Sequence, residues 1–405
     1  MKKSLLALAA LGAFAGAAHA QSSVTLYGII DEGFNYTNHV QTAAGAGRTN
    51  QSLYNLSSGV LQGSRWGLRG TEDLGGGLKA VFVLESGFDV NSGKSGQGGA
   101  LFGRQAYVGL SSQFGTVTMG RQYDSVVDYV GPLEAGDQWG GYIAAHPDDL
   151  DNFNNANRVN NAIKFTSANY AGLTFGGMYS LGGVAGATGR NQIWSLGAGY
   201  SNGPLQLGAG YLNVRDPNTS FWGNVPSSGA NPTNNIGKVT GVQGNPVISG
   251  FASANSYQVG GAGGAYTFGA ATVGVTYSFI QFGNLGTENV TAPAYRGSAT
   301  FNNGEINFKY QLTPALLVGA AYDYTHGPSI NGASTATYNQ GAVGVDYFLS
   351  KRTDVYVIGV YQHASGQVLN AAGNGVVEAT AAINGLTGSS TNNQVAARIG
   401  IRHKF

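Results

Sequence analysis

The stretch Ala-Thr-Val-Gly-Val-Thr-Tyr-Ser-Phe-Ile at residues 271–280 decides the fold, because apolar side chains alternate along it with small or polar ones. A period of two places alternate side chains on opposite faces of a β-strand. Residues 305–311 repeat the pattern, so each strand has an apolar face and a polar face. The apolar positions are Val273, Val275, Tyr277 and Phe279 in the first stretch and Ile306, Phe308 and Tyr310 in the second.

The connections between such stretches decide between a soluble sandwich and a membrane barrel, since both contain alternating strands. Short turns rich in Gly, Asn, Pro or Ser occur at 74–77, 112–115, 169–172, 202–204, 268–270, 312–314 and 350–352. Long polar stretches occur at 37–59, 124–157, 216–254 and 366–392. Tight turns at one end and long loops at the other are typical of outer-membrane barrels. We therefore expect an all-β fold, a transmembrane antiparallel β-barrel of about sixteen strands.

Two features of the sequence do not decide how the interior of this barrel is filled. Residues 355–360 are apolar on both faces, so their orientation is ambiguous. Glycines fill the expected inner faces of two neighbouring strands, where they either leave room in the lumen or relieve crowding at bends. These glycines are Gly197, Gly199, Gly208 and Gly210.

The composition excludes several other classes of protein. Charged residues make up 10% of the 405 residues, whereas a soluble domain carries about 25%. No run of 18 apolar residues occurs, which argues against a bundle of membrane-spanning helices. The chain has 0 Cys, so a disulfide framework and a Cys-based zinc site are both excluded.

Residues 1–20 have the three parts of a secretory signal peptide. Lys2 and Lys3 precede an apolar run from Leu5 to Gly16, and Ala-His-Ala at 18–20 provides a cleavage site. We expect a mature barrel domain at residues 21–405; a buried N-terminal helix is the alternative. Without the signal the net charge is near −1, from 21 − 2 = 19 basic against 20 acidic residues. The chain thus has no excess of positive charge, so we expect no nucleic-acid partner.

Several motifs carry a resemblance to a known family. They are Ser-Val-Thr-Leu-Tyr-Gly at 23–28, Gly-Ser-Arg-Trp-Gly-Leu-Arg-Gly at 63–70, Glu-Asp-Leu-Gly at 72–75, Phe-Gly-Arg-Gln-Ala-Tyr-Val-Gly-Leu at 102–110, Gly-Arg-Gln-Tyr at 120–123 and Arg-Ile-Gly-Ile-Arg-His-Lys-Phe at 398–405. With them the chain resembles the general porins of Gram-negative outer membranes, particularly the beta-proteobacterial type. The resemblance implies a passive diffusion channel for small hydrophilic solutes and ions in the outer membrane, with no cofactor.

Strand alternation brings basic side chains to the expected channel wall. If Trp66 and Leu68 meet lipid, Arg65 and Arg69 point into the lumen. If Tyr107 faces outward, Arg104 faces inward. If Ile163 and Phe165 face outward, Arg158 and Lys164 face inward. By position, Arg65, Arg104 and Arg158 resemble the family's arginine ladder at the constriction; the alternative is that they are solvated lumenal residues away from the narrowest point.

The resemblance also implies that residues 124–157 fold into the barrel as a constriction loop. Pro-Leu-Glu-Ala-Gly-Asp at 132–137 lies where the family has an acidic loop tip, so Glu134 is the first acidic candidate, followed by Asp128 and Asp137. Facing positive and negative charges would set a transverse field that orients dipolar solutes. One departure weakens the basic side, because Ile29 stands where enterobacterial porins have a lysine.

Further expectations concern assembly. Arg121 shares a face with the apolar Val117 and Met119, so it should lie near a rim or at a subunit contact, since a charge exposed to lipid is costly. The resemblance favours the contact, because general porins are homotrimers. It also implies contacts with outer-membrane lipid and lipopolysaccharide, and recognition of Phe405 by the barrel-assembly machinery.

Catalysis and metal binding find little support in the sequence. After the signal, no histidine lies in a recognised nucleophile motif. Residues 149–153 begin like a calcium loop, but Phe153 occupies the third ligand position. Residues 260–264 lack the last glycine of a dinucleotide motif. A diffusion channel is thus the expected function; a solute-specific channel, and an adhesin or surface receptor acting through its long loops, are the alternatives.

Overall fold

The structure is a computed structural model that describes residues 23–41, 50–224, 233–237, 245–288 and 295–405. The predicted signal peptide at 1–20 lies outside the described residues. The strands are β1 (Ser23–Val40), β2 (Gln51–Ser58), β3 (Arg65–Gly75), β4 (Leu78–Gly87), β5 (Gln105–Ser112), β6 (Gly115–Gln122), β7 (Val159–Ser167), β8 (Leu173–Ser180), β9 (Ile193–Asn202), β10 (Leu205–Arg215), β11 (Ser256–Phe268), β12 (Ala271–Leu285), β13 (Gly297–Thr313), β14 (Leu316–His326), β15 (Thr337–Phe348), β16 (Thr353–Ser365), β17 (Gln367–Leu369), β18 (Val376–Glu378) and β19 (Asn393–Lys404).

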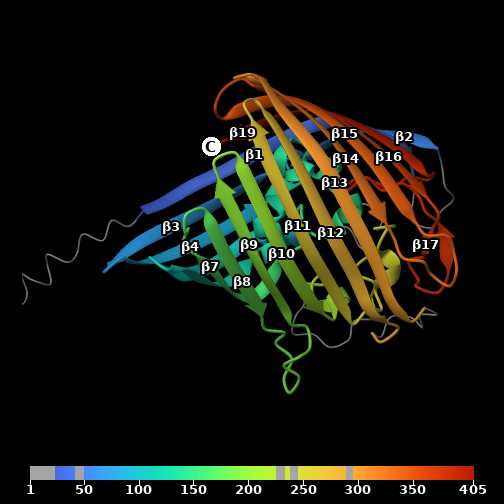
Figure 1. Ribbon diagram of the computed structural model, residues 1–405, viewed down its shortest axis with the longest axis horizontal. Helices are drawn as coiled ribbons and strands as arrows, with labels where there is room; N and C mark the ends of the chain where they lie inside the picture. The colour runs from blue at the N-terminus through green and yellow to red at the C-terminus, as the bar shows by residue number, and fades with distance from the viewer. Residues whose placement is uncertain (1–22, 42–49, 225–232, 238–244, 289–294) are drawn as a thin grey trace, which may run out of the picture.

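The described strands form a closed antiparallel barrel of 16 strands, which confirms the predicted fold (Figure 1). Strands β2 and β3 act as one barrel strand, because β1 pairs with β2 along its second half and with β3 along its first half. The first and last strands close the sheet in the register Ile29 to Lys404 and Thr37 to Ala396. Phe405 extends this ladder, since its N–H and C=O both bond the backbone of Gly28 at 3.1 Å. Every strand of the barrel therefore has a neighbour on each side.

The connections fall into two classes, as predicted. All seven short turns predicted from the sequence join neighbouring strands at one end of the barrel, and the long connections lie at the other end (Figure 1). One predicted loop was partly wrong, because residues 51–58 form β2 rather than a connection. The inner face of β2 carries Leu53, Asn55 and Ser57, and the stretch Gln-Ser-Leu-Tyr-Asn-Leu-Ser-Ser is polar enough to resemble a loop.

The alternation of faces follows the prediction in β12. Val275 and Tyr277 are 50% and 51% exposed on the outside, whereas Thr276 and Ser278 are 4% and 0% exposed on the inside. The ambiguous strand is β16, whose inner side chains are Tyr356, Ile358 and Val360; all three are buried. They are apolar because they pack with Trp139 and Ile143 of the long connection after β6.

Long connections fill part of the barrel interior. The connection after β6 contains α2 (Ser125–Tyr129), η2 (Gly131–Leu133), η3 (Gly136–Gly140), η4 (Tyr142–Ala144) and η5 (Pro147–Asp149); α3 (Pro217–Ser220) and η6 (Ser249–Phe251) lie in the connection after β10, and η1 (Gln97–Gly99) in that after β4. Among the described residues, no helix is both long and apolar enough to cross a membrane.

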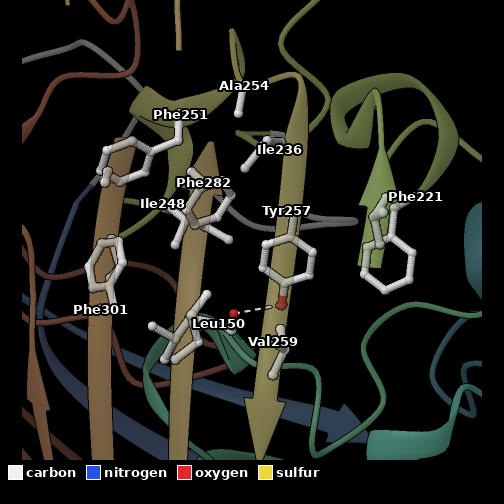
Figure 2. Packing of buried hydrophobic residues seen from close by; sticks show 14 of the residues in the cluster. Leu150, Phe221, Ile236, Ile248, Phe251, Ala254, Tyr257, Val259, Phe282 and Phe301 are labelled. Atoms are coloured by element: carbon white, nitrogen blue, oxygen red, sulfur yellow. Dashed lines mark hydrogen bonds between the residues drawn. The ribbon is translucent and has the colours of Figure 1, made fainter. Parts of the chain in front are cut away.

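An apolar core forms where these connections meet the inner wall (Figure 2). Phe251 stacks on Phe282 of β12 with ring centroids 5.0 Å apart, and Tyr257 of β11 donates a hydrogen bond to the carbonyl of Leu150 at 2.7 Å (Figure 2). The inner face of β12 accordingly changes along its length, from Thr276 and Ser278 to the buried Ile280 and Phe282. The wall is therefore apolar where Phe251 and its neighbours cover it, and polar further along β12.

Inward-facing glycines make room for the connection after β6, which answers the question that the sequence left open. A Cβ added at Gly197 or Gly208 would collide with Tyr129, and one added at Gly210 would approach Val126. The same holds on the far side of the barrel, where Gly319 of β14 and Gly344 of β15 lie against the indole of Trp139. These glycines let the connection lie flat on the wall, so that it leaves part of the lumen free.

A pair of glycines on β15 tests this packing. We expect Gly344→Val to displace Trp139 and to lower the free energy of unfolding by about 1–3 kcal/mol, the usual cost of overpacking. Gly341→Val is the matched control, because a Cβ there meets nothing within 4 Å. Thermal unfolding of the two purified variants, followed by the heat-modifiable migration of the barrel, measures the difference. Equal stability of both variants would contradict the packing role.

Candidate channel constriction

A hollow of about 920 Å³ lies inside the barrel between the wall and the connection after β6. We call residues 124–157 the constriction loop and residues 59–64, which separate β2 from β3, the wall excursion. The loop is tied to the excursion by a hydrogen bond from the N–H of Tyr142 to the carbonyl of Val60, 2.9 Å long. Both segments line the hollow, so its width depends on how they are fixed.

Three arginines line the wall side of the hollow, namely Arg65, Arg104 and Arg158. Arg65 is the first residue of β3, whereas Arg104 and Arg158 directly precede β5 and β7. The predicted outward face of Tyr107 was wrong, because Val108 and Leu110 are the residues of β5 exposed on the outside. Arg104 nevertheless reaches the hollow, because it stands before the strand, where alternation does not apply.

Neighbouring side chains fix the orientation of these guanidinium groups. The Nε of Arg104 donates to Glu85 at 2.8 Å, and its Nη2 donates to the Tyr123 hydroxyl at 3.1 Å. The guanidinium of Arg158 lies 5.7 Å from the ring centroid of the same tyrosine, a cation–π arrangement. Tyr123 thus separates two like charges while contacting both.

Two basic candidates lie outside the lining of the hollow. Arg69 is exposed nearer the short turns, with its guanidinium 5.2 Å from the ring centroid of Tyr27. Lys164 points inward from β7, forms an ion pair with Asp128 and donates to the carbonyl of Tyr123 at 2.9 Å. The charge of Lys164 is therefore neutralised within the wall.

The loop side of the hollow carries carboxylates. Asp137 is exposed to the hollow and accepts a hydrogen bond from the amide of Asn154 at 2.9 Å. Asp128 also lines the hollow, although Lys164 neutralises it. Asp149 was not among the sequence-based candidates; it lines the hollow but is only 3% exposed, because it accepts the N–H groups of Asn154 and Ala156. Of these carboxylates, Asp137 is the one that presents an exposed charge opposite the arginines.

The structure corrects the prediction for Glu134. Its side chain is 0% exposed and does not line the hollow, because it turns away toward β13. Its Oε1 accepts the N–H of His146 at 2.9 Å and thereby bridges two turns of the loop. The two carboxylates of the acidic tip therefore differ in position. Asp137 faces the hollow, whereas Glu134 is buried and holds two turns of the loop together.

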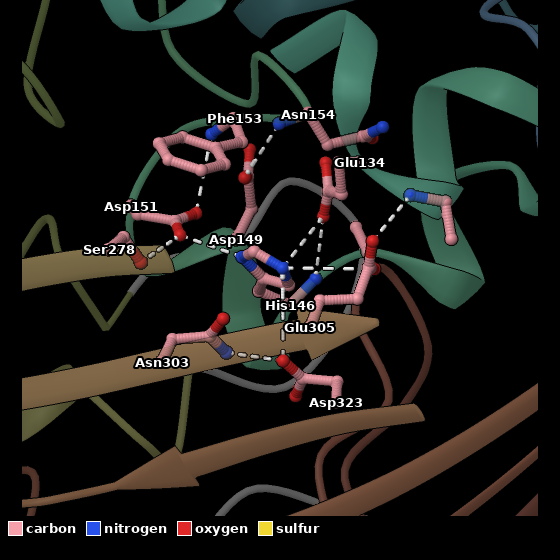
Figure 3. Close-up of polar contacts among 12 residues, drawn as sticks. Glu134, His146, Asp149, Asp151, Phe153, Asn154, Ser278, Asn303, Glu305 and Asp323 are labelled. Carbon is pink, nitrogen blue, oxygen red and sulfur yellow. Dashed lines mark hydrogen bonds and ion pairs between the residues drawn. The ribbon is translucent and has the colours of Figure 1, made fainter. Parts of the chain in front are cut away.

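Glu134 belongs to a buried polar cluster between the loop and the wall (Figure 3). His146 contacts Asp151 at 2.7 Å and lies near Glu305 of β13 and Asp323 of β14, both at 3.8 Å. Burial alone would lower the pKa of His146, but Asp151 and Glu134 raise it well above its usual value. For the carboxyl group of Glu134 burial acts in the opposite direction and raises its pKa. The sequence offered no signal for this cluster, since His146 lies in no motif and its partners on the wall, Glu305 and Asp323, are about 160 to 180 residues away along the chain.

The start of the loop is fixed by a helix cap. Asp124 is the N-cap of α2, where its carboxylate accepts the N–H of Val126 at 2.8 Å and that of Val127 at 3.3 Å. Burial raises the pKa of Asp124 to about 6, against the effect of these hydrogen bonds, which lower it. The cap turns the chain inward directly after β6.

Two further charges are placed by the structure. Arg121 lies at the loop end of β6, where it donates to the carbonyl of Gly103 at 2.7 Å and to the side chain of Asn160 at 2.5 Å. Asp31, on the strand where the sequence lacks the lysine of enterobacterial porins, is fully buried and forms an ion pair with Arg398 at 3.2 Å. Neither residue lines the hollow.

Comparison with known proteins agrees with this architecture. Residues 7–367 match the model of a family described as Gram-negative porins. The chain belongs to this family. It is 34% identical over 394 residues to an outer membrane porin protein of Bordetella pertussis, covering 89% of this chain and 94% of that protein. A porin of Delftia acidovorans, outer membrane porin protein 32, is 40% identical over 226 residues, 52% of this chain and 59% of that protein.

Solved structures show the same fold. The anion-selective porin from Comamonas acidovorans superposes with a TM-score of 0.66 at 23% sequence identity, covering 95% of this chain and 100% of that one. The outer membrane protein OmpT of Vibrio cholerae, expressed in the outer membrane, gives a TM-score of 0.59 at 15% identity, covering 95% and 98% of the two chains. Family membership together with the closed barrel makes this protein a diffusion channel of the Gram-negative outer membrane.

Cysteine labelling tests the two faces of the loop tip, because the chain has 0 Cys and any introduced thiol is unique. We expect Asp137→Cys to react with a charged, water-soluble thiol reagent in the folded protein, and Glu134→Cys to be protected. Both should react fully after unfolding, which controls for the chemistry of the thiol itself. Rapid labelling of folded Glu134→Cys would contradict the burial described above.

Proposed function

We propose that the hollow beside the constriction loop is the constriction of this channel, and that its charges favour small anions over cations among the hydrophilic solutes that pass. The supporting observation is the imbalance of charge around the hollow. Arg65, Arg104 and Arg158 line the wall side, and Asp137 is the exposed carboxylate opposite them.

Ion pairing sharpens this imbalance. Glu85 neutralises Arg104, and Lys164 neutralises Asp128. Among the described residues, Arg65 and Arg158 have no ion-pair partner, and neither has Asp137. Asp89 and the buried Asp149 line the hollow as well, and burial raises the pKa of Asp149 well above its usual value. Burial also raises the pKa of Asp137 to about 7, so near neutral pH Asp89 and a partly protonated Asp137 leave part of the charge of the two arginines uncompensated. Walls of low dielectric constant concentrate the field of such charges in a narrow passage, which raises the local concentration of counter-ions.

We further propose that the protein is a homotrimer in a lipid bilayer containing lipopolysaccharide. The family resemblance supports the trimer, and Arg121 is our candidate for a residue near the subunit contact. Its hydrogen bonds to Gly103 and Asn160 show how the charge is satisfied within one chain at the loop end of β6. Native mass spectrometry in detergent counts the chains directly; a monomer would exclude the trimer.

Phe405 fits a role as the signal read by the barrel-assembly machinery, which we also propose. It directly follows the closing strand β19, and a Cβ added at Gly28 would collide with its ring. The residue thus lies at the seam where the first and last strands meet, the place at which assembly of the barrel is completed. Replacing Phe405 by Ala should reduce the amount of assembled barrel in cells without changing the conductance of protein refolded in detergent; equal assembly would exclude the role.

Reversal potentials across a potassium chloride gradient test the selectivity. We expect Arg65→Ala to lower the permeability ratio of chloride to potassium by roughly two- to fivefold, since a unit charge at 4 Å contributes about 1 kcal/mol in water. Asp137→Asn should raise that ratio by a similar factor, and Arg352→Ala, at an exposed short turn, should leave it unchanged.

The signs of these changes decide the outcome. A shift of the same sign in Arg65→Ala and Asp137→Asn, or no shift in either, would remove both residues from the constriction. A parent channel that prefers potassium would contradict the proposed preference for anions while leaving the diffusion channel itself intact.

A further inference from the structure

We propose that Glu134, His146 and Glu305 bind a divalent transition-metal cation, which joins the constriction loop to the barrel wall. The three residues are 4% exposed or less, and each offers one ligand atom within 4.8 Å of the others. Glu134 and His146 belong to the loop, whereas Glu305 lies on β13 (Figure 3). The proposal is independent of the ion selectivity of the channel.

In each of the three side chains one polar atom has a hydrogen-bond partner and another has none. The Nδ1 of His146 contacts Asp151 Oδ2 at 2.7 Å. Glu134 Oε1 accepts the N–H of His146, and Glu305 Oε1 accepts the N–H of Ala135, both at 2.9 Å. The remaining atoms, His146 Nε2, Glu134 Oε2 and Glu305 Oε2, are buried without a hydrogen-bond partner. Side chains fixed in this way by outer hydrogen bonds are characteristic of metal ligands.

The spacing of these atoms suits a cation better than direct hydrogen bonds. His146 Nε2 lies 3.9 Å from Glu134 Oε1, and 3.8 Å from both Glu305 Oε2 and Asp323 Oδ2. These separations exceed hydrogen-bonding distance, so an Nε2–H would have no acceptor. Ligands about 2.0–2.2 Å from a tetrahedral zinc ion are roughly 3.4 Å apart. The three distances from Nε2 exceed that value by a few tenths of an ångström, and the ligand atoms of Glu134, His146 and Glu305 all lie within 4.8 Å of one another, so the side chains would draw together around the ion.

The charge of the cluster also calls for a cation. Four buried carboxylates, those of Glu134, Asp151, Glu305 and Asp323, surround a single imidazole. Buried charges in proteins are normally paired or coordinate metals. A dication at the centre would take the place of the Nε2 proton of His146, which is released to solvent, and would balance negative charge and satisfy the three free atoms at once.

The ligand types indicate which cation to test. One imidazole nitrogen with carboxylate oxygens suits zinc, whose sites combine His with Asp or Glu. Asp151 would supply the carboxylate partner that orients the ligating imidazole, and its Oδ2 in turn accepts the hydroxyl of Ser278 at 2.5 Å. Asp323, whose Oδ2 accepts from the amide of Asn303, lies 3.8 Å from His146 Nε2 and would lie beside the ion on the wall side.

Such a cation would link segments that lie far apart in the chain. Glu134 is next to Ala135, and Asp137 lies three residues further along the same loop tip. A bond from the loop to β13 would therefore fix the position of the carboxylate that faces the arginines. The metal would act on the width and the steadiness of the passage rather than on any reaction.

Zinc binding tests the proposal directly. The full chain, refolded in detergent after removal of metals with a chelator, is titrated with Zn²⁺ in competition with a chromophoric chelator. We expect about one Zn²⁺ per chain, and at least tenfold weaker binding in His146→Ala and in Glu305→Gln. Asp137→Asn and Asp128→Asn are matched controls from the same loop, and both should bind zinc as the parent does.

A second measurement covers variants that do not fold. X-ray absorption of the zinc-loaded parent should show nitrogen and oxygen neighbours, including one imidazole, and zinc should raise the unfolding temperature. Lack of stoichiometric zinc binding by the folded parent would overturn the proposal. Equal loss of binding in Asp137→Asn and Glu305→Gln would overturn it too, because the zinc would then bind in the open lumen.

Discussion

The structure depends on the pairing of backbone amides across a closed sheet. In hydrocarbon an amide without a partner costs several kcal/mol, so a spanning sheet cannot leave an edge. Here the closure joins β1 to β19, and the hydrogen bonds between Gly28 and Phe405 continue the ladder to the last residue. The alternation of side chains then follows, because one face meets lipid and the other faces the interior.

The interior is divided rather than uniformly aqueous. On the side of β8 to β15, glycines allow the constriction loop to lie on the wall, and apolar side chains of the wall pack against the connections. On the side of β2 to β4, the hollow remains open and charged. The passage is therefore displaced toward the strands that carry Arg65 and Glu85, which is why a few side chains there decide what can pass.

The sequence predicted the barrel well, because period-two alternation and turn chemistry are local signals. It predicted the tip of the loop less well. Pro-Leu-Glu-Ala-Gly-Asp indicates an acidic tip, but which carboxylate faces the lumen depends on the path of the loop, and Glu134 turned out to be buried. Arg104 reached the hollow although the orientation assumed for Tyr107 was wrong. The cluster around His146 was beyond the sequence, because it joins residues 134–151 to residues on β13 and β14.

A continuous column of water beside the constriction loop is the central claim, and single-channel recording tests it most directly. Purified protein added to a planar lipid bilayer should produce stepwise increases in current that are nearly proportional to voltage and scale with salt concentration. Correctly folded, inserted barrels that leave the membrane resistance unchanged would show that the interior is sealed, and the channel account would then be wrong.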